Sequence, residues 1–261
     1  MNGLLTAGRI IFAIAMVFFG VEFFIFVSSM NGPLPGPPWS RGVLALDWFA
    51  CVGFVAAGVS IATGKMARLV AMVLGVVLLL YGVLRYVPAL VTRVHDPGPW
   101  TVIFEILAMV GGAWVLAAGF PVGGRSSPSW DNIMWRLADA GRFLIAIALV
   151  VFAVQHFMYA GFVATLVPAW IPGHLFWAYF TGLAFVAAAL AIATKNMMRL
   201  AAMLLGTMFL LWVVLLHAPR VAGAPRNGDE VTSLFVAVAM CGLSFALAGV
   251  YGRGRKGAFI S

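Results

Sequence analysis

Residues 61–80 read IATGKMARLVAMVLGVVLLL, and residues 192–211 read IATKNMMRLAAMLLGTMFLL. Twelve of the twenty positions are identical at a spacing of 131 residues. The similarity extends to two shorter pairs of segments: 7–9 (AGR) with 140–142, and 101–109 (TVIFEILAM) with 232–240 (TSLFVAVAM). These matches predict that the chain is an internal duplication with one copy in each half.

The composition places the duplicated segments in a membrane. Of the 261 residues, 64% are hydrophobic and 9% are charged, whereas ordinary soluble domains are about 45–50% apolar and about 25% charged. No stretch alternates polar and apolar residues, so we expect an all-α fold. Eight stretches approach the ~20 apolar residues of a spanning helix: 8–28, 45–63, 69–88, 100–119, 142–160, 175–194, 200–217 and 232–250. The sequence therefore predicts a polytopic membrane protein with eight transmembrane helices.

The expected architecture is two four-helix bundles related as a parallel repeat. Each copy holds four helices, so both copies enter the membrane with the same orientation. We expect the first repeat at 1–120, a cytoplasmic interfacial linker at 121–139, and the second repeat with a basic tail at 140–261. Trp130 and Trp135 favour a linker that lies along the membrane surface.

The distribution of basic residues predicts the orientation. An even number of helices puts both termini on one side, and that side carries eleven of the sixteen basic residues. They are Arg9, Lys65, Arg68, Arg125, Arg136, Arg142, Lys195, Arg199, Arg253, Arg255 and Lys256, against Arg41, Arg85, Arg93, Arg220 and Arg226 opposite. By the positive-inside rule, we expect a multi-pass protein of the cytoplasmic (inner) membrane with both termini in the cytoplasm.

Charge and cysteine content exclude two classes of function. The net charge is +8, but the basic residues are scattered over segment ends and form no basic face for a nucleic acid. Cys51 and Cys241 each lie in an apolar segment, so we expect no metal site. The expected partners are the lipid bilayer and other membrane protein subunits.

Several motifs in the second half resemble those of a known family. They are Arg142-Phe143-Leu144, Gln155-His156-Phe157, the loop 167–172 (VPAWIP), Trp177-x-Tyr179-Phe180-Thr181-Gly182, and His217-Ala218-Pro219-Arg220. Together they resemble the DoxX and DoxD families of four-helix membrane proteins, here duplicated in one chain. The first half matches more loosely, because the segment 33–38 (PLPGPP) replaces the VPAWIP loop. The resemblance implies a subunit associated with a quinone-linked redox complex in the membrane.

Ionisable residues inside the first-half spans mark a candidate polar network. Glu22, Arg85 and Glu105 all fall within ~10 Å of the outer surface at 1.5 Å per residue. Because a charge inside a membrane is costly, we expect these three side chains to converge. The network either fixes helix register as an ion pair or handles protons or a ligand.

The second half replaces this network with two histidines. Glu22 aligns with Gln155 beside His156, and Arg85 aligns with Leu216 beside His217. Imidazoles on two helices can hydrogen-bond a quinone or ligate haem. A quinone fits better, because no haem or metal motif accompanies the histidines. The hypothetical quinone site comprises His156, Trp177, Tyr179, His217 and Arg220; the alternative is that these residues pack the bundle and its aromatic belt.

Three functions stay open at this point, and the sequence does not decide whether the protein is an enzyme. The first is a redox-linked subunit that exchanges electrons or protons with quinone. A second is a non-catalytic subunit that anchors or scaffolds a larger membrane complex, which the short loops favour. The last is a small-molecule transporter, which ranks lowest because no span is broken near its middle.

Overall fold

The computed structural model describes residues 3–28, 44–120 and 128–252. Within these ranges the chain is helical, with turns and no strands. The helices are α1 (Gly3–Ser28), α2 (Leu44–Thr63), α3 (Ala67–Thr92), α4 (Pro97–Gly119), α5 (Pro128–Met158), α6 (Ala160–Leu166), α7 (His174–Thr194), α8 (Met198–Trp212), the π-helical η2 (Val213–His217), α9 (Ala218–Gly223) and α10 (Gly228–Tyr251). The all-α class is confirmed. The loop at 33–38 and Arg41, Arg125, Arg253, Arg255 and Lys256 lie outside the described residues.

Seven of the described helices are long and apolar enough to cross a membrane. These are the helical stretches from Gly3–Glu22, Ala67–Thr92, Pro97–Gly119, Pro128–Met158, His174–Thr194, Met198–Gly223 and Gly228–Tyr251. The described apolar part of α2, Trp48–Thr63, is shorter. The chain thus has the helices of a polytopic membrane protein.

The turns that precede α3 and α8 have the same backbone conformation. Met66 precedes α3 with φ 53°, and Met197 precedes α8 with φ 54°. Both are left-handed conformations that side chains other than glycine adopt rarely. The aligned sequence stretches therefore end one helix and start the next in the same way.

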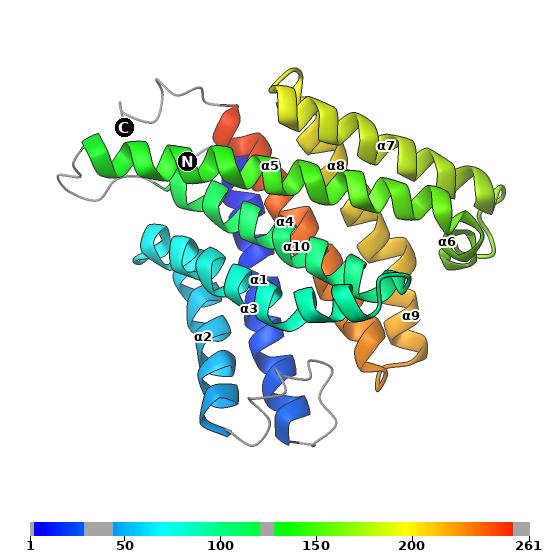
Figure 1. Ribbon diagram of the computed structural model, residues 1–261, viewed down its shortest axis with the longest axis horizontal. Helices are drawn as coiled ribbons and strands as arrows, with labels where there is room; N and C mark the ends of the chain where they lie inside the picture. The colour runs from blue at the N-terminus through cyan, green and yellow to red at the C-terminus, as the bar shows by residue number, and fades with distance from the viewer. Residues whose placement is uncertain (1–2, 29–43, 121–127, 253–261) are drawn as a thin grey trace.

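The first helix of each half packs on the last helix of the other half (Figure 1). Helix α1 contacts α2 and α10, whereas α5 contacts α4 and α7. The pairs α3 with α4 and α8 with α10 complete each half, and α4 meets α10 at the centre. A bundle closed within one half would instead place its first helix mainly on its own last helix. These helix pairs therefore cross between the two halves of the chain, whereas we expected each half to form a four-helix bundle.

Glycines make both crossings possible. A Cβ on Gly8 would collide with the backbone of Gly242, and a Cβ on Gly141 would collide with the backbone of Gly111. Only helices without side chains at the contact approach so closely. Gly8 aligns with Gly141, and Gly111 aligns with Gly242, so the two crossings use corresponding residues.

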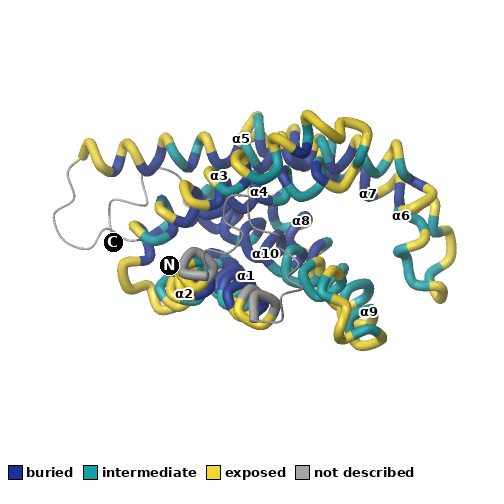
Figure 2. The backbone as a smooth tube through the Cα atoms, turned by 60° about the horizontal axis from the view of Figure 1, so that its bottom comes forward, coloured by how far each residue is buried: buried dark blue, intermediate teal, exposed yellow. Residues whose placement is uncertain are grey.

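Burial separates central from peripheral helices, as Figure 2 shows. In α4 and α10, 67% of the most apolar window is buried, against 33% in α3 and 22% in the rod formed by α8, η2 and α9. The peripheral helices expose large apolar side chains such as Val77, Leu84 and Leu204. In a membrane these faces lie against lipid, which removes the cost of their exposure to water.

The predicted linker ends inside a helix. Helix α5 runs without interruption from Pro128, whereas we expected a linker to residue 139 and a span from residue 142. Its first turns are anchored, because Asp131, Met134 and Trp135 are buried. The second part of the linker is therefore an extension of α5 packed on the protein.

Candidate functional site

Glu22 is hydrogen-bonded across the two halves. Its side chain is buried on α1, and its Oε1 accepts a hydrogen bond from Thr232 Oγ1 on α10. The other oxygen, Oε2, is buried without a hydrogen-bond partner. The ion pairs between described residues do not include Glu22, so its observed contact is with a hydroxyl group of the second half.

A corresponding contact joins α5 to α4. Thr101 Oγ1 lies 3.2 Å from Gln155 Oε1 and donates to it, while Gln155 Nε2 donates to the Pro97 carbonyl at 3.2 Å. Gln155 aligns with Glu22, and Thr101 aligns with Thr232. The sequence alignment therefore contains the signal for a pairing between the halves, whereas we expected Glu22 to pair with residues of the first half.

Arg85 and Glu105 both lie near Tyr86. The Arg85 guanidinium is 5.7 Å from the centre of the Tyr86 ring, and Tyr86 interacts electrostatically with Glu105 as well. The Tyr86 ring in turn packs edge-on against Tyr81, with centroids 6.1 Å apart. These four residues form a polar cluster between α3 and α4, while Glu22 faces α10.

His156 is held inside an aromatic cluster of the second half. Its Nδ1 lies 2.8 Å from the Phe152 carbonyl and donates to it, which leaves Nε2 as the acceptor of the neutral ring. The imidazole packs edge-on against Phe185 at 5.1 Å and stacks on Trp212 at 6.1 Å. One nitrogen of this histidine is thus free for a donor from a ligand.

His217 is the last residue of the π-helical turn η2. Its Nδ1 is buried and has no hydrogen-bond partner. π-Helical turns are rare and are frequent at functional sites. Arg220, which we assign to the same hypothetical site, is engaged in a two-pronged ion pair: its Nε and Nη2 donate to Glu230 at 2.8 and 2.5 Å. An anionic headgroup at Arg220 would compete with Glu230.

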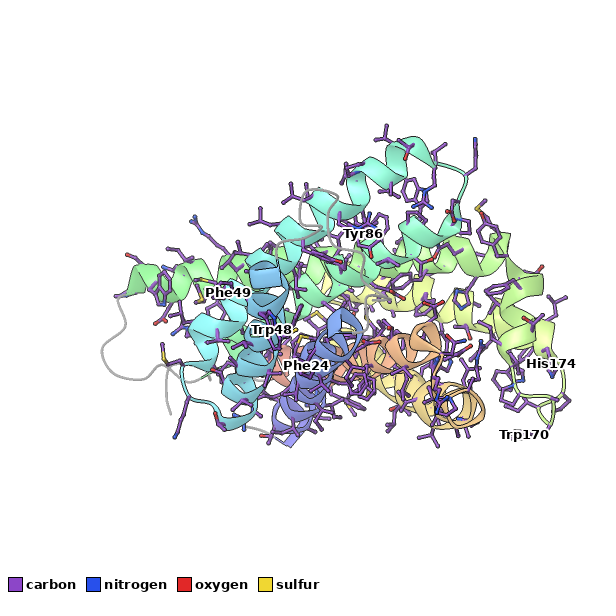
Figure 3. The ribbon with its side chains drawn as sticks, turned by 90° about the horizontal axis from the view of Figure 1, so that it is seen from below. Phe24, Trp48, Phe49, Tyr86, Trp170 and His174 are labelled. Atoms are coloured by element: carbon purple, nitrogen blue, oxygen red, sulfur yellow. The ribbon has the colours of Figure 1, made fainter. Side chains whose placement is uncertain are left out.

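Trp177 and Tyr179 make their contacts with other residues of the second half. Trp177 Nε1 donates to the Pro172 carbonyl at 3.1 Å, and the Tyr179 ring stacks on Phe157. The ring contacts between described residues join neither of them to His156 or His217. Figure 3 shows Trp170 and His174 at the same end of the molecule, away from Phe24 and Trp48.

A polar cluster that we did not predict lies where α5, α7 and α10 meet. Arg142 Nη1 donates to the carbonyls of Ile192 and Ala193 in the last turn of α7, at 3.0 and 2.5 Å. Asp139 accepts from Arg142 at 3.2 Å, from Lys195 at 2.8 Å and from Tyr251 at 3.0 Å. A cation at the C-terminus of a helix interacts favourably with the exposed carbonyls. The cluster therefore locks α5, α7 and α10 together.

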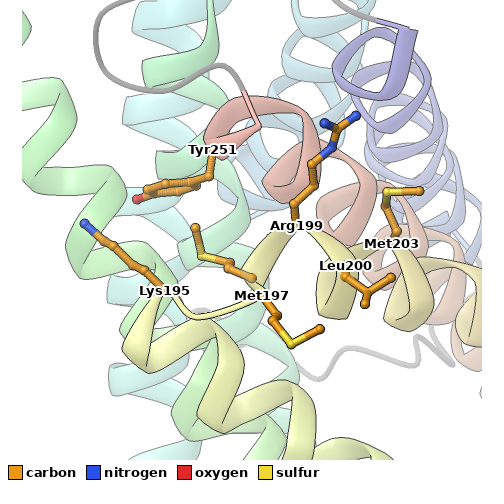
Figure 4. Close-up of a pocket in the computed structure, with 7 residues that line it drawn as sticks. Lys195, Met197, Arg199, Leu200, Met203 and Tyr251 are labelled. Carbon is orange, nitrogen blue, oxygen red and sulfur yellow. The ribbon is translucent and has the colours of Figure 1, made fainter.

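A hollow of about 460 Å³ opens beside this cluster (Figure 4). The residues that line it are Lys195, Met197, Met198, Arg199, Leu200, Met203 and Tyr251. They come from the turn between α7 and α8, the first turns of α8 and the end of α10. The lining combines cationic and apolar side chains. In the sequence, Lys195 and Arg199 indicate only the orientation of the helices.

Neither cysteines nor acids and histidines form a metal site in the part of the chain that the structure describes. No group of three or more histidine, cysteine, aspartate or glutamate side chains comes together there. Cys51 and Cys241 are both buried, and neither takes part in a disulfide bond between described residues. A quinone, by contrast, requires only hydrogen-bond donors and acceptors, and both histidines offer a ring nitrogen.

One family model matches part of the chain. It is described as a domain of unknown function, DUF8561, and it covers residues 145–240. The matched region runs from α5 into α10 and includes His156 and His217. Comparison with curated proteins and with solved structures found no match.

Proposed function

We propose that this chain is an integral membrane subunit that assembles with other membrane proteins. The observation that carries the proposal is the outward face of α2. Gly53 and Ala56 are exposed on it, and a Cβ on Gly53 would meet nothing within 4 Å. Small residues on a membrane helix allow a second helix to approach closely. This face therefore suits a transmembrane helix of a partner.

The opposite face of α2 shows what such a contact looks like. There, a Cβ on Gly58 would collide with Ala13 and Val17 of α1. Both faces carry small residues, and among the described residues the Gly58 face is the one that packs closely on α1. The exposed apolar side chains Phe49 and Val52 flank Gly53 on the outward face.

Three glycine variants test the assembly. Gly53→Leu should remove the partner from complexes extracted in native-membrane nanodiscs, as a loss of particle mass, while the chain stays folded. Gly161→Leu is the matched control, because a Cβ on Gly161 also meets nothing within 4 Å and the residue lies on the short helix α6. Gly58→Leu should instead unfold the chain. Unchanged particle mass for Gly53→Leu would contradict the proposal.

We infer further that the chain crosses the cytoplasmic membrane eight times as a parallel duplication with both termini in the cytoplasm. Three observations support this inference. The crossings at Gly8 and Gly141 use aligned residues. Glu22 and Gln155, also aligned, each pair with a threonine of the other half. Leu5 near the start of α1 lies against Gly249 near the end of α10, as helices with ends on one side require.

Single cysteines introduced into a background without Cys51 and Cys241 test the topology. Lys65→Cys and Asn196→Cys, in the aligned inner turns, should react with an impermeant thiol reagent only from the cytoplasmic side. His95→Cys and Asn227→Cys should react only from the other side. Labelling of positions 65 and 196 from opposite sides would show an inverted repeat instead.

A quinone-linked role is the second candidate, favoured by the buried and unpartnered Nδ1 of His217. A quinone carbonyl could accept a hydrogen bond from this nitrogen when it carries the ring proton. A quinone-linked role agrees with the resemblance of the second half to the DoxX family. Quinone extracted from purified nanodiscs should fall for His217→Phe and stay unchanged for the solvent-exposed His95→Phe. Equal quinone content in all three proteins would remove this candidate.

A further inference from the structure

The hollow at the start of α8 is lined by both cationic and apolar side chains. Figure 4 shows Lys195 on one side and Arg199 on the other, and the apolar lining includes Met197, Leu200 and Met203. We propose that it binds the headgroup of an anionic phospholipid, with the phosphate on the Arg199 guanidinium. The proposal rests on the membrane embedding of the helices and is independent of the partner face on α2.

The charges around the hollow leave an excess of positive charge. Lys195 and Arg142 share the carboxylate of Asp139, so three cations with Arg199 face one acid. The ion pairs among the described residues do not include Arg199, and its side chain is exposed. Its stem packs over the backbone at Gly252, where a Cβ would lie 3.1 Å from Cδ and from Nε. This contact holds the guanidinium at the edge of the hollow.

The corresponding arginine of the first half shows what the position binds. Arg68 aligns with Arg199, and its Nη2 lies 2.6 Å from Asp131 Oδ1. The pair is shielded, with 16% of the Arg68 side chain and 11% of the Asp131 side chain exposed. The N-terminal extension of α5 thus supplies an oxyanion to the first arginine.

The described part of α1 has no residue that could do the same for Arg199. α5 and α1 correspond at a spacing of 133, so Gly3, where described α1 begins, aligns with Arg136. The described chain therefore contains no counterpart of Asp131 at this arginine. By comparison with Arg68, the proposed ligand of Arg199 is an oxyanion that belongs to another molecule.

The apolar side chains next to Arg199 indicate that this oxyanion belongs to a lipid. Met197 and Leu200 are exposed next to Arg199, and the apolar surface continues along α8 to Leu204 and Leu211. In a membrane, that surface faces acyl chains, and the helix ends lie at headgroup depth. A phospholipid offers the phosphate and the chains in one molecule. Basic pockets at the cytoplasmic ends of membrane helices commonly bind anionic headgroups, and the planar guanidinium matches phosphate oxygens.

Native mass spectrometry of the full chain in detergent tests the proposal. The probe is an equimolar mixture of palmitoyl-oleoyl phosphatidylglycerol and phosphatidylcholine. The wild-type chain should retain phosphatidylglycerol preferentially, and Arg199→Gln should lower the preference about fivefold. Arg199→Lys should keep most of it, because the charge remains. Arg136→Gln is the matched control: it removes an exposed arginine near the inner end that does not line the hollow.

Four outcomes would overturn the proposal. They are the absence of any lipid preference in the wild-type chain, an equal loss for Arg136→Gln, displacement of the lipid by an equal concentration of inorganic phosphate, and an unchanged preference in Arg199→Gln. Because the isolated chain is the sample, the lipid result does not depend on the partner that Gly53→Leu removes.

Discussion

Arg68 and Arg199 occupy aligned positions at the inner ends of α3 and α8, but their surroundings differ. Arg68 is paired with Asp131 of the α5 extension, whereas Arg199 is exposed beside a hollow. The turns before both arginines have the same backbone conformation, since both pass through a left-handed methionine. The difference teaches that two aligned arginines can be placed differently: one is shielded by an acid of its own chain, and the other is left exposed.

The positions of Glu22 and Gln155 differ in charge but share one type of hydrogen bond. Glu22 and Gln155 each accept a hydrogen bond from a threonine of the opposite half. An acid and an amide of nearly the same shape thus occupy matched positions. The helix crossings between the halves are matched as well, so the two halves differ most where side chains face water, lipid headgroups or each other's polar groups.

The helix crossings should give the largest effects. Gly242→Leu and Gly111→Leu each place a side chain against backbone, at Phe12 and Gly141 respectively. Overpacking typically costs about 1–3 kcal/mol, and more where backbone cannot yield, so both variants should fail to give monodisperse protein. Size-exclusion chromatography after extraction measures this, with Gly53→Leu as the tolerated control. If only one of the two variants fails, the crossings are not equivalent.

Arg142→Met should have the next largest effect. The substitution removes the donors to two carbonyls of α7 and leaves Asp139 with fewer partners. Hydrogen bonds from a charged group contribute about 1.5–3 kcal/mol to stability, and we expect a loss of about 2–3 kcal/mol. Unfolding in mixed micelles measures the change. Arg199→Met, at an exposed arginine, should change the stability by no more than about 0.5 kcal/mol. An equal loss for both variants would show that the contacts of Arg142 with α7 and Asp139 do not stabilise the fold.

Arg68→Gln and Arg199→Gln compare the two inner ends directly. Removing Arg68 leaves Asp131 shielded without its cation, which should cost about 1–3 kcal/mol, because shielded acids are costly without a partner. Arg199→Gln should cost about 0.5 kcal/mol or less. The double variant Arg68→Leu and Asp131→Leu should recover part of the loss. Unfolding measurements on all four proteins check this, and similar losses for Arg68→Gln and Arg199→Gln would erase the contrast.

Glu22→Gln should have the smallest effect. It gives the first half the amide that the second half already has at Gln155, and it removes a buried carboxylate oxygen without a partner. We expect stability to change by about 1 kcal/mol or less, towards greater stability. Thr232→Val, which removes the donor, should cost about 1 kcal/mol. A larger loss for Glu22→Gln than for Thr232→Val would show that the negative charge itself is needed.

Hydropathy and periodicity were enough to predict the all-α class and the approximate helices. Burial inside a membrane depends on the apolar content of continuous segments, and that property is local in sequence. Helix boundaries were less certain: α5 extends back to Pro128 because Asp131, Met134 and Trp135 find buried positions on other helices. Such contacts lie far along the chain and leave no local signal.

The candidate sites were only partly predictable for the same reason. Sequence alignment pairs Glu22 with Gln155, but only the tertiary structure decides that each faces a threonine of the other half. The sequence also presents His156, Trp177, Tyr179 and His217 near one depth, whereas only the tertiary structure shows that His156 stacks on Trp212 and Tyr179 stacks on Phe157. By itself, the sequence determined which segments are helices and which residues correspond between the halves. The tertiary structure decided which helices pair, because close approach at Gly8, Gly111, Gly141 and Gly242 depends on surfaces that meet only after folding.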